Sequence, residues 1–448
     1  MHLRKPGLVV ATHFERNPLV LLRDWIEDAR RRTLELIADL SADQLVIPQL
    51  PTVNPILWEV GHVAWFQEKW VLRHVFHRWP LHDRVDELYD SSAVSHDSRW
   101  SLPLPPREDM LSYVDAVRNA VVECLETCSP DSMRQAVYFA LLTVFHEDMH
   151  AEALTYTRQT LAFSAPRLRP SVMLPPEGGP VGGDVHIPGG VFSLGASNDG
   201  SFVFDNEKWA HDIRLVPFSI ARAPVTQGEF AGFIEDGGYR RQELWTAEGW
   251  QWRDETGAAR PVYWKQGANG WMRRHFDEWV GLEPHLPVIH VNWHEANAYC
   301  RWAGRRLPTE AEWELAASGS LDAPRKRPFP WGVAPPQANT ANLDWGHMGC
   351  LAVGALPEGD SAFGCRQMIG NVWEWTASDF LPYPGFVPDP YEEYSQPWFG
   401  TRKVLRGGCW ATPGRLLRNT WRNFFEPHRR DIFAGFRTCA HRLTRDCP

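Results

Sequence analysis

The first third of the chain has the periodicity of helices. Apolar residues recur at three- and four-residue spacing, which is typical of amphipathic helices that bury one face. Four long stretches show this pattern, at residues 20–40, 55–76, 107–128 and 132–161. Four such helices predict a bundle, in which inward-facing side chains from different helices can bind a metal.

Beyond residue 163 the helical periodicity largely disappears. Pro and Gly dominate residues 164–184, where they break any regular element. Short β-prone runs then alternate with turns, as in residues 184–195 and 211–226. Helical spacing returns in residues 226–238 and 293–304, within a long irregular stretch rich in Trp, Gly and Pro. Loops of this length in a compact domain are often functional.

We therefore predict an α+β protein of two domains, because 448 residues are too many for one ordinary core. The boundaries follow the changes of pattern. A helical bundle is expected over residues 15–165, a linker over residues 166–184, and a mixed domain over residues 185–445.

Composition narrows the function. The net charge of −9 gives no reason to expect nucleic acid or an anionic membrane as a partner. No apolar run approaches a membrane span, and the start of the chain lacks a secretory signal, so a cytoplasmic location is expected. The eight cysteines form no C-x-x-C pair and are expected to be reduced thiols. The 23 tryptophans supply aromatic faces of the kind that bind quaternary ammonium groups.

Residues 146–150 form a literal H-E-x-x-H motif. On a helix His146 and His150 lie on one face and can share a metal, and in a zinc protease Glu147 would be the general base. No suitable third ligand follows the motif, whereas His62 on the second predicted helix offers one. The sequence thus favours a three-histidine site, with Glu147 and Asp148 as solvated or salt-bridged residues at the helix surface.

Longer segments resemble two known domains. "PILWEVGHVAWFQEKW" and "FHEDMHAEAL" resemble the iron-binding helices of the DinB-like domain in ergothioneine-type sulfoxide synthases, the EgtB family. The second half, with "RLPTEAEWE" and "GNVWEWT", resembles the formylglycine-generating-enzyme (sulfatase-modifying factor) domain, which has a C-type-lectin-like fold. Together these segments span nearly the whole chain.

The resemblance implies a non-heme iron enzyme. Its Fe(II) would be bound by His62, His146 and His150, and its substrates would be O2 and hercynine, the trimethylbetaine of histidine. A tyrosine acts near the iron in the family, and the loop after "WEWT" offers Tyr383, Tyr391 and Tyr394, of which we favour the last two.

The resemblance also implies a substrate cleft, expected between the two domains. Three residues match the segments that shape this cleft, Asn423, Arg429 and Arg430. Four aromatic residues are candidates for contacting the trimethylammonium group, Trp375, Trp421, Phe424 and Phe425. The remaining signature residues should be structural, with charge-assisted hydrogen bonds from Arg306, Glu310, Glu312 and Glu314, and with Trp313, Asn371 and Trp373 packed in the core.

Three departures from the family pattern concern the substrates. Met149 stands where members carry a residue that helps to place the imidazole, and Phe425 stands where an Asp pairs with the amino group of the thiol donor. Many members of the family have an arginine-rich segment that binds a peptide carboxylate, and only Arg99 of these arginines is present here. A neutral donor suits this pattern, so the chain resembles selenoneine synthases of the SenA type, which join hercynine to a selenosugar. An EgtB-type reaction with cysteine or γ-glutamylcysteine is the alternative.

Other classes remain open on sequence grounds. A formylglycine-generating enzyme needs two reactive cysteines after "RGG", and the corresponding segment has only Cys409. A zinc hydrolase would contain zinc and act without O2. A non-catalytic binding module would tolerate alanine at His62. The sequence leaves the oligomeric state open.

Overall fold

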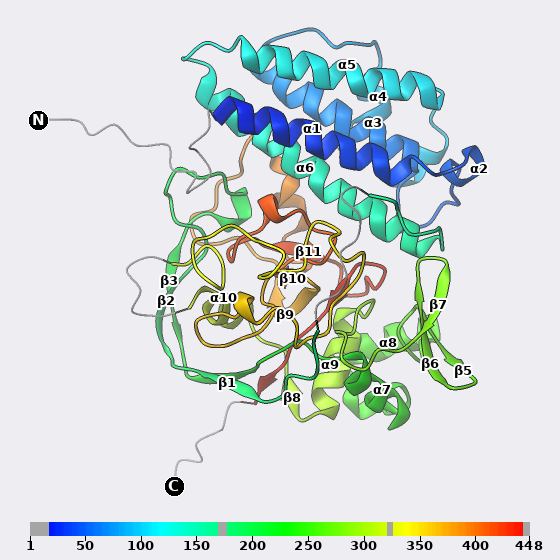
Figure 1. The fold of residues 1–448 in the computed structure, drawn as a ribbon, viewed down its shortest axis with the longest axis vertical. Helices are drawn as coiled ribbons and strands as arrows, with labels where there is room; N and C mark the ends of the chain where they lie inside the picture. The colour runs from blue at the N-terminus through cyan, green and yellow to red at the C-terminus, as the bar shows by residue number, and fades with distance from the viewer. Residues whose placement is uncertain (1–17, 169–176, 320–325, 442–448) are drawn as a thin grey trace, which may run out of the picture. The chain divides into compact units, whose positions relative to one another are not determined.

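The computed structural model describes residues 18–168, 177–319 and 326–441, and it divides into two compact units (Figure 1). The first unit takes residues up to 158, with short segments at 166–168 and 200–202, and the second unit takes the rest. Parts of the predicted domains and linker, at residues 15–17, 169–176 and 442–445, lie outside the described residues.

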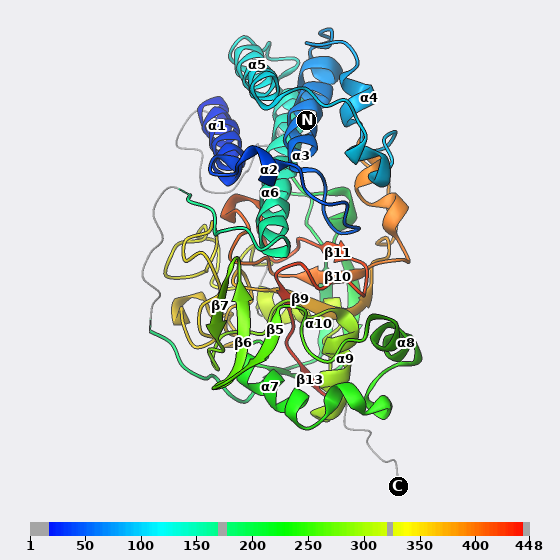
Figure 2. The same cartoon turned by 90° about the vertical axis from the view of Figure 1, so that its right-hand side faces the viewer.

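The first unit is helical, as predicted. Helix α3 packs against α5, and α1 also packs against α5 (Figures 1 and 2). The long predicted helices correspond to α1, to α3 with its π-helical continuation, to α5 and to α6. The helices are α1 (Pro18–Ile37), α2 (Ala42–Leu45), α3 (Ile56–Gln67), the π-helix (Glu68–Val75), α4 (Val85–Tyr89), a 3-10 turn (His96–Trp100), α5 (Arg107–Glu126) and α6 (Met133–Thr160).

The described residues of the second unit form four small sheets. One has the strand order β1-β4-β13-β8 and another has the order β11-β10-β9-β12, in which β12 is parallel to β9. Strands β2-β3 and β5-β6-β7 form antiparallel ribbons. The strands are β1 (Asp184–Ile187), β2 (Gly190–Leu194), β3 (His211–Leu215), β4 (Phe218–Ala221), β5 (Trp264–Gly267), β6 (Gly270–His275), β7 (Glu278–Gly281), β8 (Arg305–Arg306), β9 (Trp373–Asp379), β10 (Lys403–Arg406), β11 (Asn423–Phe425), β12 (Ala434–Gly435) and β13 (Cys439–Ala440).

Four α-helices accompany these sheets. The two predicted helices are confirmed as α7 (Gln227–Glu235) and α9 (Trp293–Trp302). Two more were not predicted, α8 (Ala247–Thr256) and α10 (Glu310–Ser318). The start of α10 carries a capping box, in which Thr309 accepts from the backbone N–H of Glu312, and this local signal was present in the sequence.

Short 3-10 turns and loops make up much of the second unit. The turns are Asp205–Glu207, Gly238–Arg240, Gln242–Leu244, Pro357–Gly359, Glu392–Tyr394, Gln396–Trp398 and Gly414–Leu416. An apolar cluster that includes Ile187, Ile220 and Trp313 fills the space between β1, β4 and α10. Buried Arg–Glu pairs complete this core, and the predicted charge-assisted hydrogen bonds of Glu310 and Glu314 are confirmed among them. They are Arg406–Glu314, Arg422–Glu310 and Arg437–Glu374.

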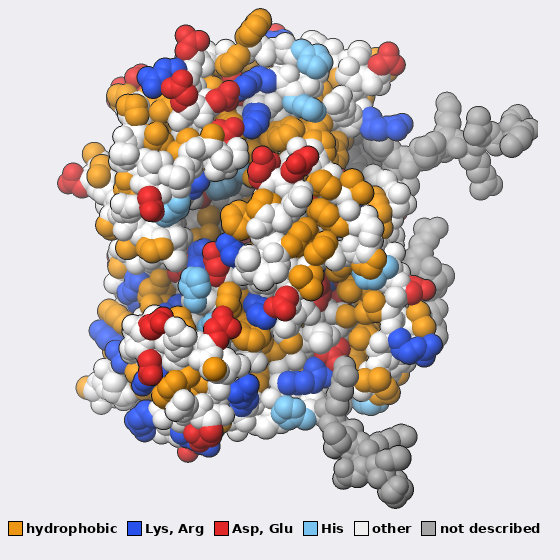
Figure 3. All heavy atoms as spheres, turned by 180° about the vertical axis from the view of Figure 1, so that it is seen from behind, with side chains coloured by type: hydrophobic (Ala, Val, Ile, Leu, Met, Phe, Trp, Pro, Cys, Tyr) orange, Lys and Arg blue, Asp and Glu red, His pale blue; other side chains and the backbone are white. Residues whose placement is uncertain are grey.

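The described surface mixes charges of both signs. On the face drawn in Figure 3, acidic and basic side chains are interspersed with apolar ones. Among the described helices, none combines the length and the apolar character that crossing a membrane requires.

The buried histidine of helix α9 predicts acid sensitivity. His294 is buried, and burial, together with the positive charge of His428, lowers its pKa to about 4. In the unfolded chain this imidazole has its usual pKa of 6.5 and takes up a proton there, whereas in the folded chain it stays neutral down to about pH 4. The folded state therefore loses stability as the pH falls from 6.5 towards 4. From about pH 7 to about pH 5 this group alone removes about 2 kcal/mol. Urea unfolding of His294→Gln should show a shallower pH dependence than wild type, and an equal slope would contradict this assignment.

Candidate metal centre

Three histidines converge in the first unit. His62 comes from α3, and His146 and His150 come from adjacent turns of α6. Each offers one ring nitrogen, and the three nitrogens lie within 4.8 Å of one another. Among the described residues they form the one cluster of three or more His, Cys, Asp or Glu side chains with this spacing. Three imidazoles on two helices match the set of ligands predicted from the sequence.

The ring of His62 is oriented by a backbone carbonyl. Its Nδ1 atom lies 2.8 Å from the carbonyl oxygen of Tyr89, at the end of α4. A carbonyl oxygen only accepts, so Nδ1 carries the hydrogen and Nε2 keeps its lone pair for a metal. Gly61 makes this contact sterically feasible, because a Cβ atom at position 61 would lie 2.4 Å from the ring of Tyr89.

The ring of His150 is oriented by a carboxylate. Its Nδ1 atom lies 2.7 Å from Oε1 of Glu59, which is buried on α3. A carboxylate that accepts from the distal ring nitrogen fixes the tautomer and raises the basicity of the ligating nitrogen. Glu59 therefore acts as a positioning residue for the metal ligand.

Aromatic rings hold the other faces of the ligands. His146 stacks on Phe66, with ring centroids 3.7 Å apart and planes 9° apart. His62 stacks on Trp58 with centroids 4.8 Å apart. These contacts limit rotation of both imidazoles and exclude water from their flanks.

The electrostatics favour neutral ligands. Burial holds the pKa of His62 and of His146 well below the usual range, and the positive charge of a protonated His150 lowers both further. Both rings are therefore neutral at neutral pH, which is the form that binds a metal. Three imidazoles whose ring nitrogens converge on one point fit a first-row divalent metal with open coordination positions.

Glu147 lies in the interior, which corrects the prediction that it is a residue of the helix surface. It is 1% exposed and forms a bidentate ion pair with Arg30, at 2.8 and 3.2 Å. Arg30 also donates to the carbonyl of Val114 and to Gln67. The predicted salt bridge thus exists, but it is buried. A carboxylate held in this way is poorly suited to serve as the general base of a protease.

Asp148 is buried as well, so of the two predicted environments, solvated or salt-bridged, the solvated one is wrong. Met149, its neighbour, is half-buried. Arg99 is partly buried and stacks 4.0 Å above the ring of Trp58. Its guanidinium donates to Asn54 at 2.6 Å and to the carbonyl of Val94 at 3.3 Å. Two nitrogens of Arg99 therefore already have partners within the protein.

The second unit brings several of the predicted substrate residues together in an aromatic cluster. Tyr394 stacks on Phe204 at 4.4 Å and meets the edge of Phe424 at 5.9 Å. Tyr391 lies 6.3 Å from Tyr394 between ring centroids, and Trp421 lies 6.4 Å from Phe204. Burial raises the pKa of Tyr394 above its usual value, so its phenol stays protonated.

Tyr383 has a different environment from Tyr391 and Tyr394. It is buried, and its hydroxyl donates to Glu310 at 3.0 Å. The guanidinium of Arg422 lies 4.1 Å above its ring. These contacts account for Tyr383 as a structural residue.

The remaining predicted residues lie on or beside β11. Asn423 and Phe425 are half-buried on this strand. Arg429 lies 5.1 Å above the ring of Phe425 and forms two hydrogen bonds of 2.7 Å with Asp431. Arg430 lies 3.8 Å from Glu295 and 5.2 Å from the ring of Trp252.

Trp375 belongs to the interior of the second unit. Its side chain is fully buried, and its indole donates to the carbonyl of Val291 at 2.9 Å. Trp373 and Asn371 are buried as well, which agrees with their predicted core role. Cys409 is also buried, and its backbone N–H donates to Thr412.

Comparisons with known proteins match both units. The DinB superfamily model matches residues 26–154, and the sulfatase-modifying factor enzyme 1-like domain model matches residues 171–442. The hercynine oxygenase of Mycolicibacterium smegmatis is 40% identical over 425 residues, covering 93% of this chain and 97% of that protein. The chain belongs to the hercynine oxygenase family.

Further relatives agree with this membership. The hercynine oxygenase of Mycobacterium tuberculosis is 40% identical over 414 residues, covering 91% of this chain and 96% of that protein. A formylglycine-generating enzyme of Streptomyces coelicolor is 32% identical over 255 residues, covering 51% of this chain and 78% of that protein. As a member of the hercynine oxygenase family the chain is an enzyme, an oxidoreductase. The predicted α+β fold, a DinB-like bundle followed by a formylglycine-generating-enzyme-like domain, is confirmed.

The residues that orient the ligands were not predicted from the sequence. Glu59 lies three residues before His62 on the same helix, and this i,i+3 spacing was a usable signal. The carbonyl of Tyr89 and the side chain of Arg30 gave no signal, because their partners are distant in sequence.

Removal of the carboxylate that orients His150 should weaken metal binding. Glu59→Gln keeps the shape of the side chain but lowers its strength as an acceptor, and the dissociation constant for the metal should rise roughly 10- to 100-fold. The measurement is a competition titration with a metal-binding dye under anaerobic conditions.

The control is Glu68→Gln. Glu68 is also buried, in the π-helix, but accepts from the hydroxyl of Tyr113 rather than from a histidine. It should bind metal as tightly as wild type. Equal affinities for Glu59→Gln and wild type would show that the hydrogen bond does not support the ligand.

Proposed function

We propose that the chain is a non-heme Fe(II)- and O2-dependent enzyme that joins a selenium donor to C2 of hercynine and forms a selenoxide in selenoneine biosynthesis. The donor we favour is a selenosugar, as in synthases of the SenA type. The observation that carries the proposal is the three-histidine centre, in which Tyr89 orients the ring of His62 and Glu59 orients that of His150. The 40% identity to hercynine oxygenases along both units supports hercynine as the acceptor.

The reaction balances without a further reductant. The C2–H bond of hercynine and the Se–H bond of the donor are broken, and a C–Se bond and an Se=O bond form. These two changes release four electrons, which reduce O2 to water and the selenoxide oxygen. Fe(II) on three imidazoles would supply the open positions and the redox chemistry that this exchange requires.

The side chains have separate roles in this proposal. His62, His146 and His150 hold the metal through neutral rings. The phenol of Tyr394 stays protonated and is suited to deliver a proton, with Tyr391 as the second candidate. The aromatic faces around Tyr394, to which Phe424 contributes, suit the trimethylammonium group of hercynine.

Charge pairing supports a neutral donor. A thiol donor with a free carboxylate needs an available cation, and each candidate arginine already has partners within the protein. Arg429 is bound to Asp431, Arg430 lies near Glu295, and Arg99 donates to Asn54. Phe425 adds no carboxylate that could pair with a donor amino group. A sugar requires neither kind of group.

Sulfur remains the alternative donor. The relatives that cover most of this chain are hercynine oxygenases, and the resemblance to ergothioneine-type sulfoxide synthases extends to both domains. With cysteine or γ-glutamylcysteine the same bond changes would give a sulfoxide.

The central test compares donors directly. Protein loaded anaerobically with Fe(II) is mixed with hercynine, O2 and one donor at a time, and products are identified by mass spectrometry. The selenosugar should give the adduct with the highest kcat/KM, and ¹⁸O2 should place one labelled oxygen in it. Faster reaction with a thiol would establish the sulfur alternative. If no donor gives an adduct, the proposal is refuted. Hydrolytic activity of the zinc-loaded protein without O2 would indicate a hydrolase.

A substitution at β11 tests the basis of donor choice. Phe425→Asp introduces a carboxylate that can pair with the amino group of γ-glutamylcysteine, and such a charged hydrogen bond adds roughly 1.5–3 kcal/mol. The kcat/KM for that thiol should rise about tenfold or more. Phe425→Leu is the control. It replaces the ring by a smaller apolar side chain without adding charge, so the kcat/KM for the thiol should stay unchanged. If Phe425→Asp and Phe425→Leu change the kcat/KM for the thiol equally, position 425 does not determine the choice of donor.

A further inference from the structure

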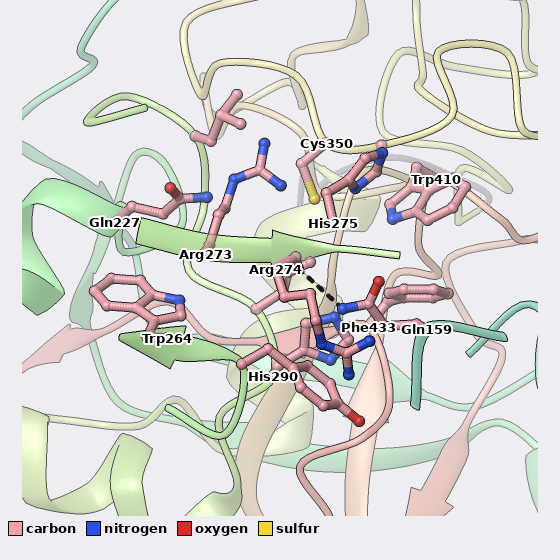
Figure 4. Close-up of a pocket in the computed structure, with 14 residues that line it drawn as sticks. Gln159, Gln227, Trp264, Arg273, Arg274, His275, His290, Cys350, Trp410 and Phe433 are labelled. Atoms are coloured by element: carbon pink, nitrogen blue, oxygen red, sulfur yellow. Dashed lines mark hydrogen bonds between the residues drawn. The ribbon is translucent and has the colours of Figure 1, made fainter. Parts of the chain in front are cut away.

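A polar cavity lies within the second unit (Figure 4). Its volume is about 20 Å³, which is room for one or two water-sized groups. The wall is built by consecutive residues of β6 and by loops distant in sequence. The lining residues used below are Arg273, Arg274, His275, His290, Cys350 and Trp410.

Three nitrogen atoms of this lining are buried without a hydrogen-bond partner among the described residues. They are Nε1 of Trp410, Nε of Arg273 and Nδ1 of His290. Trp410 is 1% exposed and His290 is 5% exposed, so bulk water does not satisfy them. Buried polar atoms are rarely left unpaired, and three such atoms around one cavity indicate an occupant.

The other polar groups of the wall are already satisfied. The side-chain oxygen of Gln159 accepts from the backbone N–H of Phe276 at 2.6 Å. The thiol of Cys350 donates to the carbonyl of Asn371 at 3.4 Å. The polar atoms left for an occupant are therefore chiefly donors, because an indole N–H and a guanidinium N–H cannot accept.

The field in the cavity is positive. Arg274 donates to the carbonyls of Phe276 and Thr160, and no carboxylate of the described residues pairs with it. Arg273 pairs with Glu283 at 2.5 Å, but the side chain of Glu283 is largely exposed. Burial, together with the positive charge of Arg274, lowers the pKa of His290 to about 3. A metal cation would be repelled here, although histidine and cysteine side chains are close.

We propose that this cavity binds one small inorganic anion of the size of chloride. Trp410 and Arg273 would donate hydrogen bonds to it, and Arg274 would balance its charge. The anion would also favour protonation of His290, which makes Nδ1 a third donor.

The anion would tie together three parts of the second unit. Arg273 and Arg274 belong to the β5-β6-β7 ribbon, His290 precedes helix α9, and Trp410 follows β10. An occupant that contacts all three stabilises the folded unit, since the unfolded chain has no such cavity. The inference does not depend on which donor or metal the enzyme uses.

Thermal unfolding of the full-length protein provides the test. Sodium chloride is replaced stepwise by sodium gluconate at constant ionic strength, because gluconate is too large for the cavity. The unfolding midpoint of wild type should rise with chloride and saturate. Trp410→Phe keeps an aromatic side chain but removes the indole N–H. In this variant the chloride concentration that gives half of the rise in the unfolding midpoint should increase at least tenfold.

Trp245→Phe is the matched control. Trp245 is also buried in the second unit and donates to the carbonyl of Gly238, but it does not line the cavity. Its variant should be less stable yet keep the wild-type response to chloride. A chloride effect that persists unchanged in Trp410→Phe would assign the ion elsewhere, including the three-histidine centre, and would overturn the proposal.

A crystal soaked in bromide gives the direct measurement. An anomalous peak within hydrogen-bond distance of Trp410 Nε1 is expected. Equal midpoints in chloride and gluconate, or a cavity without bromide, would mean that water alone fills it.

Discussion

A long irregular chain can be buried only if its carbonyl groups find donors, and in the second unit buried arginines supply them. Arg406 donates to the carbonyls of residues 419, 420 and 421, and Arg437 donates to those of residues 221, 222, 366 and 367. Each guanidinium is held by a buried glutamate, Glu314 for Arg406 and Glu374 for Arg437. The loops that carry the aromatic cluster and the polar cavity depend on this frame.

In the first unit, too, buried polar groups need hydrogen-bond partners, but here the groups are a few side chains of one helix. Helix α6 is buried over most of its middle turns, so every polar residue there needs an internal partner. Glu147 finds Arg30, and His150 finds Glu59. These hydrogen bonds restrict the rotation of the side chains that make them, which helps to keep the ligating nitrogens close together before any metal arrives.

Local patterns explain which parts of the molecule could be predicted. Helical periodicity and the i,i+4 spacing of His146 and His150 are short-range properties, and they identified the bundle and the ligand pair. The burial of Glu147 could not be predicted, because its partner Arg30 lies 117 residues away. Helix α8 has a Thr246 cap but almost no amphipathic pattern, so its sequence resembles a loop. The polar cavity is assembled from several segments that are distant in sequence, so no sequence spacing predicts it.

Because the three ligands come from two helices, a bound ion would affect the stability of the folded protein. His62 belongs to α3 and the other two ligands to α6, so an ion bound by all three cross-links elements far apart in the chain. Such an ion binds the folded bundle only, and at a free concentration a hundred times its dissociation constant it adds about 2.7 kcal/mol to stability. Occupancy of the centre would thus lengthen the lifetime of the folded protein, whatever reaction the ion takes part in.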